Sequence, residues 1–228
     1  MSSPEAKEPQ NQSQVDAYLE RGPAKMGPWT THIWRNDPRH IGFLLARYKF
    51  VAKMLSGKGP VLEVGCGDAF GTPVVLQEVA SVHGIDFEPV VLEDARERFA
   101  AEGDDRATFA IHDMLEGPTE QRFDAAFALD VIEHIPPDRE GDFIANIAGS
   151  LKPDGICILG TPNIAAEKYA SEASREGHVN LKSPQALRES LAPHFQNVFS
   201  FGMNDEVLHT GYHAMCHYIL AMGVGLKA

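Results

Sequence analysis

From Pro60 onward, short apolar stretches alternate with segments of helical periodicity, and this alternation constrains the fold more than any other feature of the chain. Five stretches have the length of buried strands, at 60–64, 81–85, 108–112, 123–128 and 155–160. Helical patterns cover 73–80, 89–101, 138–151 and 184–192. Because each gap between strands is long enough for a crossover helix, the sequence predicts an α/β fold, a parallel sheet with helices on both faces.

The C-terminal part follows a different pattern. Two strand-like runs, NVFSFGM and YHAMCHYILAMG, are joined by NDEVLHTG, and no helical segment separates them. Strands that are joined without a crossover helix pair antiparallel. We therefore expect an antiparallel hairpin at the edge of the sheet.

The N-terminal part divides into two segments before the main domain. Residues 1–17 are polar and rich in Pro and Gln, which predicts a disordered tail. Residues 18–57 contain both tryptophans and a helix that opens at Asp37-Pro38 and ends near Gly57, so we expect a helical segment that acts as a lid. Residues 58–228 form the predicted main domain.

Composition excludes several classes of partner. The net charge of the 228-residue chain is −12 and no Lys/Arg cluster is present, so nucleic acid and anionic membrane surfaces are poor partners. No apolar run reaches the roughly 18 residues of a membrane span, and no secretion signal opens the chain. Three scattered cysteines fit a reducing compartment. We expect a cytoplasmic protein that acts on a small molecule.

A glycine-rich turn follows the first strand, in the stretch VLEVGCGDAFG (61–71). Gly65 and Gly67 lie in the turn, and such a turn before a helix directs backbone N–H groups at a ligand. The dinucleotide fingerprint requires glycine at the position that Phe70 occupies, which disfavours a pyrophosphate. A purely structural turn is the alternative.

Further polar residues follow the next three strands. Asp86, beside Phe87, ends the second strand, where a carboxylate can accept both hydroxyls of an adenosine ribose; a strand-end cap is the alternative. Asp113, after the third strand, can accept the amine of adenine, with Met114 against the ring; a helix N-cap is the alternative. The fourth strand ends at Leu129 and is followed by Asp130 and the pair Glu133-His134. The carboxyl ends of parallel strands meet at the edge where ligands bind.

Taken together, these motifs resemble a known family. LEVGCGDAFG, GIDFEP, AIHDML, FDAAFALDVIEHI and LKPDGICILGTPN look like the successive motifs of class I S-adenosylmethionine-dependent methyltransferases of the small-molecule branch. The resemblance implies a Rossmann-like seven-stranded, mostly parallel sheet with an antiparallel last strand. Ala69 replaces a glycine of the family pattern. A looser similarity, in GPWTTHIWRNDPRHIGFLLARYKFVAKML and FSFGMNDEVLHTGY, is to bacterial methyltransferases of surface-glycan and sugar-nucleotide pathways.

The resemblance also implies a set of residues that bind S-adenosylmethionine. The turn of Gly65, Cys66 and Gly67 would hold its methionine part, with Glu63 behind the turn and the Leu129 backbone near the amine. Asp86 would hold the ribose, and Asp113 with Met114 the adenine. The expected binding set also includes four more residues: Phe87, Asp130, Arg47 and Trp34. Arg47 reaches either the cofactor carboxylate or a surface acid, and Trp34, like Tyr18 and Trp29, folds over the cofactor or simply covers the sheet.

Histidines are the candidate catalytic residues. If the acceptor is a hydroxyl, a general base assists, and imidazole suits that task near neutral pH. His178 lies in a predicted long loop over residues 162–182, and His134 follows the fourth strand; each is either the base or a pocket residue. His209, His213 and His217 share one parity, but the first lies in a predicted turn, so we expect no metal site.

The sequence therefore predicts methyl transfer from S-adenosylmethionine to a small polar acceptor, at a hydroxyl of a sugar, glycan precursor or similar metabolite. The Asn/Asp-Pro-Pro-Tyr motif of enzymes that methylate base or glutamine nitrogens is replaced by Leu-Asp-Val-Ile at 129–132. Two alternatives stay open: a module that binds S-adenosylmethionine without turnover, and a Rossmann-type NAD-binding oxidoreductase. The oligomeric state is not encoded in any of these patterns.

Overall fold

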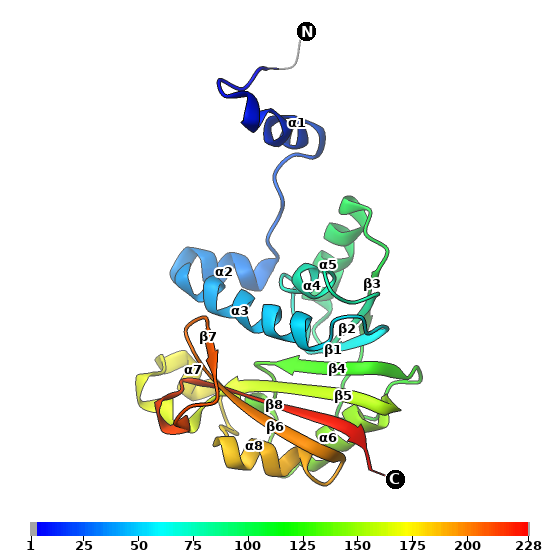
Figure 1. Ribbon diagram of the computed structural model, residues 1–228, viewed down its shortest axis with the longest axis vertical. Coiled ribbons are helices and arrows are strands. Elements are labelled where there is room, and N and C mark those ends of the chain that lie inside the picture. The colour runs from blue at the N-terminus through cyan, green and yellow to red at the C-terminus, as the bar shows by residue number, and fades with distance from the viewer. Residues whose placement is uncertain (1–3, 228) are drawn as a thin grey trace.

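The computed structural model, which describes residues 4–227, contains one mixed sheet with helices on both faces (Figure 1). Its strand order is β3-β2-β1-β4-β5-β8-β6-β7. The strands are β1 (Val61–Val64), β2 (Val82–Asp86), β3 (Ala107–Ile111), β4 (Phe123–Leu129), β5 (Leu151–Pro162), β6 (Phe195–Asn204), β7 (Val207–His209) and β8 (Tyr218–Leu226). The first five strands are parallel, and β8 lies antiparallel between β5 and β6. The predicted α/β, Rossmann-like class is confirmed.

The sheet has one more strand than the sequence predicts. The extra strand, β7, is three residues long and pairs antiparallel with the end of β6, from Gly202↔His209 to Asn204↔Val207. It lies within the segment expected to be only a connection. A tight turn at Asp205, whose φ is +49°, brings the chain back onto β6, so backbone groups that would face water pair with each other.

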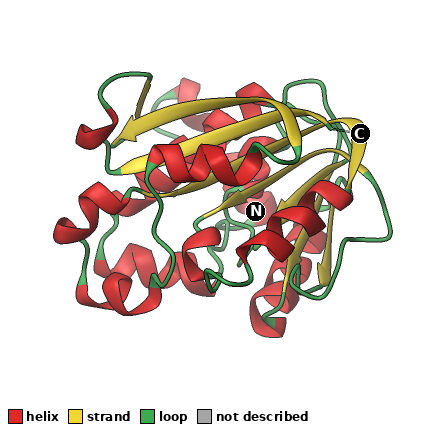
Figure 2. Ribbon diagram, turned by 90° about the horizontal axis from the view of Figure 1, so that it is seen from below, coloured by secondary structure: helices red, strands yellow, loops and turns green. Residues whose placement is uncertain are grey.

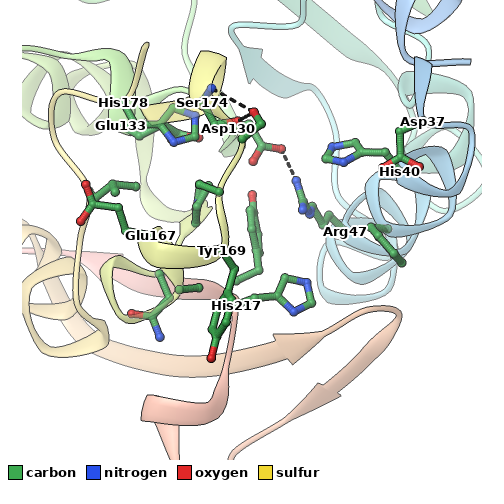
Figure 3. Close-up of a pocket in the computed structure, with 18 of the residues that line it drawn as sticks. Asp37, His40, Arg47, Asp130, Glu133, Glu167, Tyr169, Ser174, His178 and His217 are labelled. Atoms are coloured by element: carbon green, nitrogen blue, oxygen red, sulfur yellow. Dashed lines mark hydrogen bonds and ion pairs between the residues drawn. The ribbon is translucent and has the colours of Figure 1, made fainter. Parts of the chain in front are cut away.

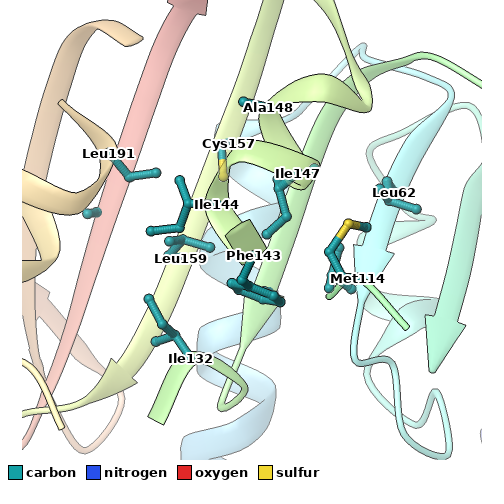
Figure 4. Packing of buried hydrophobic residues seen from close by; sticks show 14 of the residues in the cluster. Leu62, Met114, Ile132, Phe143, Ile144, Ile147, Ala148, Cys157, Leu159 and Leu191 are labelled. Carbon is teal, nitrogen blue, oxygen red and sulfur yellow. The ribbon is translucent and has the colours of Figure 1, made fainter. Parts of the chain in front are cut away.

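Two apolar cores fill the space between the sheet and its helices. Helices α6 (Glu140–Gly149) and α8 (Pro184–Leu191) cover one face, with Phe143, Ile147 and Leu191 in that core (Figure 4). Helices α3 (Arg39–Met54), α4 (Thr72–Val75) and α5 (Pro89–Glu102) cover the other face. Figure 2 shows the twist of the sheet between the two layers. Within residues 4–227, no helix combines the length and apolarity that a bilayer crossing requires.

The N-terminal segment contains two further helices. A 3-10 turn, Pro9–Asn11, leads into α1 (Gln12–Arg21), which has no buried residue and projects from the body of the molecule (Figure 1). The predicted disordered tail covers residues 1–17, of which residues 1–3 lie outside the described part of the chain. The predicted end of the tail, at residue 17, falls inside α1. Helix α2 (Pro28–Asn36) contacts both α3 and α5.

The connection over residues 162–182 is not the long loop that the sequence predicts. It contains a 3-10 helix, Ile164–Tyr169, and α7 (Glu172–Gly177). The Asn163 side chain accepts a hydrogen bond from the N–H of Ala165, and the Ser171 hydroxyl accepts one from Ser174. Both are N-cap interactions, which satisfy the first free N–H groups of a helix. The prediction failed because the segment lacks an apolar periodicity.

Phe143 offers a test of this packing. It is 1% exposed at the centre of the α6 layer, so Phe143→Ala should lower the free energy of unfolding by about 3–5 kcal/mol. Phe199→Ala, on β6 with half of its side chain exposed, is the matched control and should cost much less. Urea unfolding followed by circular dichroism measures both. Equal losses in the two variants would contradict the assignment of the core.

Candidate active site

The glycine turn adopts a conformation that favours glycine at two positions. Gly65 and Gly67 have φ values of +69° and +51°, in the left-handed region. A Cβ on Gly65 would also lie 2.5 Å from Cγ2 of Val131, so the turn and the segment after β4 are in close contact. Ala69, at the position of the family's third glycine, has a φ of +53°. The backbone therefore keeps the glycine-like conformation there despite the side chain.

Glu63 supports the turn from beneath. Its carboxylate is buried and accepts hydrogen bonds from the Tyr48 hydroxyl at 2.8 Å and the Thr72 hydroxyl at 2.6 Å. Burial raises the pKa of Glu63 to about 7. Glu63 thus lies behind the turn, as the sequence predicts. Both carboxylate oxygens of Glu63 already accept hydrogen bonds from protein hydroxyls.

Cys66, in the middle of the turn, packs as a small buried residue. Its side chain is 4% exposed, and burial raises the pKa of the thiol. A Cβ on Gly84 of the neighbouring β2 would lie 3.0 Å from the Cys66 sulfur. The thiol is therefore a packing group, and the backbone N–H and carbonyl of Cys66 pair with Ile85 and Ala69.

Asp86 lies at the carboxyl end of β2 and is tied to the glycine turn. Its Oδ2 accepts a hydrogen bond from the N–H of Gly67 at 2.9 Å, and its Oδ1 accepts one from Glu88 at 2.9 Å. Each carboxylate oxygen keeps lone pairs for a further donor. The adjacent Phe87 is 71% exposed. The structure thus places a carboxylate and an exposed aromatic ring together beside the turn.

The two residues after β3 behave differently from each other. Asp113 accepts a hydrogen bond from the N–H of Leu115 at 2.8 Å within a turn, and no helix lies between β3 and β4 for it to cap, so the helix N-cap considered as its alternative role is wrong. Met114 is 4% exposed and packs in the core near Leu62 (Figure 4). Its side chain is therefore occupied by the core, and a contact with adenine through that side chain is not available in this structure.

Helix α2 is fastened to the glycine turn by Asp68. The Asp68 carboxylate accepts hydrogen bonds from the N–H of Thr30 at 2.8 Å and from its hydroxyl at 3.1 Å, and both residues are buried. Trp29 lies against the turn, because a Cβ on Gly67 would be 3.0 Å from its Cδ1. Trp34, the tryptophan expected in the binding set, lies near the end of the helix; both tryptophans are about half exposed, and the contact with Gly67 is what distinguishes Trp29. The helical periodicity of this segment does not indicate which of the two tryptophans, Trp29 or Trp34, contacts the glycine turn.

A cavity of about 860 Å³ opens beside the carboxyl edge of the sheet (Figure 3). Its wall combines residues of α2, α3, the segment after β4, the 162–182 connection and β8. Five histidines line it among the described residues: His32, His40, His134, His178 and His217. Burial lowers the pKa of His40 and of His217, so both rings are neutral at pH 7. No local pattern in the sequence indicates that His32, His40 and His217 belong to one site.

Arg47 and Asp130 meet at this cavity. Their side chains form an ion pair (Figure 3), with 2.6 Å between the two atoms, and the Arg47 guanidinium also lies 3.8 Å from the centre of the Tyr218 ring. Arg47 is 5% exposed, so it does not pair with a surface acid. Leu129 is buried at the end of β4, and Asp130 follows with a φ of +57°. This conformation turns the Asp130 side chain from the sheet edge toward Arg47.

Both candidate catalytic histidines line the cavity and lie next to each other. The rings of His134 and His178 are 5.1 Å apart between centroids, and Nδ1 of His134 lies 2.9 Å from the carbonyl oxygen of Gly177. Burial, followed by the positive charge that His134 can carry, lowers the pKa of His178. Glu133, which is not among the residues predicted for the site, is buried beside them, and burial together with the nearby Asp130 charge raises its pKa to about 8.

The three histidines near the C-terminus do not gather. His209 lies on β7 with Nε2 3.2 Å from the Asn204 side chain and 3.7 Å from the Cys216 sulfur. His213 lies in the 3-10 turn His213–Met215, and His217 lines the cavity. Within residues 4–227, the group of His, Cys, Asp or Glu side chains whose ligand atoms come together is instead Glu133, His134 and His178.

Comparison with known proteins decides what kind of domain this is. Residues 61–155 match the family model of a methyltransferase domain. This part of the chain therefore resembles a methyltransferase domain, and its fold is that of solved S-adenosylmethionine-dependent methyltransferases. The resemblance seen in the motifs is confirmed, and the cofactor of this family is S-adenosylmethionine. The match weighs against the NAD-binding oxidoreductase.

Individual relatives agree on the methyltransferase fold. A ubiquinone biosynthesis O-methyltransferase of Rickettsia felis is 27% identical over 150 residues, which is 61% of this chain and 60% of the relative. One of Actinobacillus pleuropneumoniae is 32% identical over 124 residues, 52% of this chain and 51% of the relative. The chain thus spans little more than half the length of these relatives. The N-methyltransferase NodS of Bradyrhizobium japonicum, solved with S-adenosyl-L-homocysteine, superposes with a TM-score of 0.61 at 19% identity, over 92% of this chain and 97% of that one.

The raised pKa of Glu63 predicts a pH-dependent stability difference. Since its folded-state pKa of about 7 exceeds the ordinary value of 4.5, this carboxyl stabilises the fold below pH 4.5, and the contribution is lost as pH rises through 7. Glu63→Gln resembles the protonated acid. The variant should therefore gain stability relative to wild type between pH 5 and 8, by at most about 3 kcal/mol. Chemical denaturation at several pH values measures the difference, and a difference that stays constant would refute the shift.

Proposed function

We propose that this protein transfers a methyl group from S-adenosylmethionine to a hydroxyl of a small polar acceptor bound in the cavity. The main observation in support of this proposal is that Asp130 borders both the glycine turn and the cavity. It follows β4 beside the glycine turn, where Gly65 and Val131 are in contact, and it also lines the cavity. The cofactor side and the acceptor side therefore meet at one residue.

The residues at the carboxyl edge fit the cofactor in shape and charge. The backbone turn of Gly65, Cys66 and Gly67 suits the methionine part by its shape, since its N–H groups already donate to the Ile85 carbonyl and to Asp86, and the Leu129 backbone faces the amine. Asp86 suits the ribose diol because its oxygens keep free lone pairs, and the exposed Phe87 ring suits the adenine. We keep Asp113 in this set only through its carboxylate. When bound, S-adenosylmethionine supplies a methyl group already activated by the sulfonium.

The N-terminal residues take two roles in this proposal. Arg47 orients Asp130 through their ion pair. Because its guanidinium is engaged there, Arg47 does not bind the cofactor directly in this proposal. Helix α2 is the lid, and Trp29, against Gly67, takes the place that Trp34 held in the expected set. Because the Asp68–Thr30 hydrogen bonds are buried, the lid is held in a fixed position over the turn.

The cavity supports a hydroxyl acceptor of the sugar or glycan-precursor type. Its wall offers imidazole, carboxylate and amide groups from several elements, which suit a molecule with many hydroxyls. The names of two relatives, both O-methyltransferases, favour oxygen as the acceptor atom. A phosphoethanolamine N-methyltransferase of Caenorhabditis elegans is 39% identical over 101 residues. A nitrogen acceptor is therefore the alternative outcome of an acceptor screen.

His134 and His178 are the groups that we assign to deprotonation of the acceptor. They line the cavity, and an imidazole beside a hydroxyl can remove its proton as the new bond to carbon forms. Exclusion of water and alignment of the acceptor supply the remaining catalysis, since the methyl group needs no further activation. A module without turnover would bind the cofactor but leave every acceptor unmodified.

Removal of the Asp86 carboxylate should weaken cofactor binding. Asp86→Ala should reduce the affinity for S-adenosylhomocysteine by about 1.5–3 kcal/mol, or roughly 10- to 150-fold, because the ribose loses a charged acceptor. Calorimetry measures the change. Asp105→Ala, which removes an exposed acid after α5, is the matched control and should bind normally. Unchanged binding by the Asp86 variant would overturn the cofactor assignment.

Removal of the His178 side chain should affect turnover rather than cofactor binding. His178→Ala should lower kcat by roughly 10²–10⁴, while the affinity for S-adenosylhomocysteine stays near wild type, because the side chain lies on the acceptor side. His194→Ala, at a histidine after α8, is the control. Steady-state kinetics with an acceptor found by metabolite screening provides the measurement. Normal turnover in the His178 variant would show that this side chain takes no part in the reaction.

A further inference from the structure

Three potential metal ligands come together at the wall of the cavity. One ligand atom each from Glu133, His134 and His178 lies within 4.8 Å of the others. Glu133 and His134 belong to the 3-10 turn Ile132–His134 after β4, and His178 follows α7 in the 162–182 connection. Only the tertiary fold brings these two segments together.

Glu133 has an unsatisfied oxygen at this position. The side chain is fully buried; its Oε2 accepts a hydrogen bond from the Thr161 hydroxyl at 2.9 Å, whereas Oε1 has no hydrogen-bond partner within the described part of the chain. A buried polar atom without a partner is costly, and carboxylates removed from water are normally paired or bound to a metal. This oxygen is therefore available to a cation, which would displace the proton that the buried carboxyl otherwise keeps near neutral pH.

His134 is oriented as metal-binding histidines are. Its Nδ1 lies 2.9 Å from the carbonyl oxygen of Gly177, and because a carbonyl only accepts, Nδ1 carries the proton. The lone pair is then on Nε2. Ligating histidines usually donate their second N–H to a carbonyl or carboxylate in this manner. Gly177 also directly precedes His178, so one segment both orients one histidine and supplies the other.

The charges around the cluster favour a cation. Asp37, Glu167 and Asp205 line the same cavity, and the one arginine among its lining residues, Arg47, is paired with Asp130, so this pair adds no net charge. A cavity lined mainly by one sign of charge raises the local concentration of the opposite sign. An anionic ligand would be disfavoured at this wall.

We propose that Glu133, His134 and His178 bind one divalent transition-metal ion. Two imidazoles and one carboxylate form the ligand set of many catalytic Zn²⁺ sites, which leave a further position open for water or substrate. Asp130 and Ser174 also line the cavity, but they are not among the three side chains whose ligand atoms come together, so we do not assign them as metal ligands. The sequence alone predicted no metal site. The histidines that share a regular spacing lie near the C-terminus, whereas Glu133 and His134 are far from His178 along the chain.

The catalytic consequence rests on the proposed function. The acceptor hydroxyl would occupy the open position, where a bound cation lowers the pKa of a coordinated O–H by several units. Its proton passes to water in the cavity. The acceptor oxygen then forms the bond to the methyl carbon as the C–S bond of the cofactor breaks, and the electron pair stays on sulfur. The two histidines would then act as ligands and the metal would replace the general base.

Calorimetry with Zn²⁺ alone tests the binding site in the full chain after dialysis against EDTA. The wild type should bind one ion per chain at this site. Glu133→Gln, which keeps the shape of the side chain, and His178→Ala should each weaken that binding by at least about 10- to 100-fold, the loss seen when even an outer partner of a ligand is removed. His194→Ala is the control and should bind as wild type, and circular dichroism verifies the fold of each variant.

Two results would overturn the metal site: no Zn²⁺ binding at micromolar concentration, or wild-type affinity and stoichiometry in both cluster variants. Titration with S-adenosylhomocysteine separates this failure from failure of the proposed function. A chain that binds S-adenosylhomocysteine but not Zn²⁺ keeps the function and loses the metal. A chain that binds Zn²⁺ through the cluster but not S-adenosylhomocysteine keeps the metal and loses the function.

Discussion

The ion pair between Arg47 and Asp130 is the interaction on which the candidate site depends. It joins α3 to the end of β4, and the Arg47 guanidinium also lies over the Tyr218 ring of β8. Side-chain exposure is 6% for Arg47 and 30% for Asp130, so loss of Asp130 would leave the Arg47 charge in a largely dry environment. Such losses are strongly destabilising even where the intact pair contributes little. The pair therefore fixes the position of three elements that surround the cavity.

The strand order places this pair at the point where the sheet can bind a ligand. From β1 the chain proceeds outward to β2 and β3, and then returns to β4 on the other side of β1. Loops that leave β1 and β4 run in opposite directions, and a crevice opens between them. The glycine turn, Asp86 and Asp130 all follow strands at this edge. The methyltransferase fold and the cavity are thus consequences of one topological feature.

The fold could be predicted because its signals are local. Apolar runs bounded by turn residues locate the parallel strands, and β2 and β3 begin within one residue of expectation. Asp86 could be predicted for the same reason, since a carboxylate at a strand end lies at the binding edge whatever the details of packing. The helices at 164–177 were missed because hydrogen bonds from Asn163 and Ser171 set them, and not an apolar pattern.

The sequence by itself determined the class of the fold, the glycine turn and the acids that follow the strands, because each depends on residues close together in the chain. The tertiary structure decided which side chains share a space. It put Met114 in the core, placed Trp29 rather than Trp34 on the turn, and brought His178 to Glu133 and His134. These contacts join segments that are far apart in sequence, and the direction of each side chain follows from the packing of helices and strands, which no local pattern encodes.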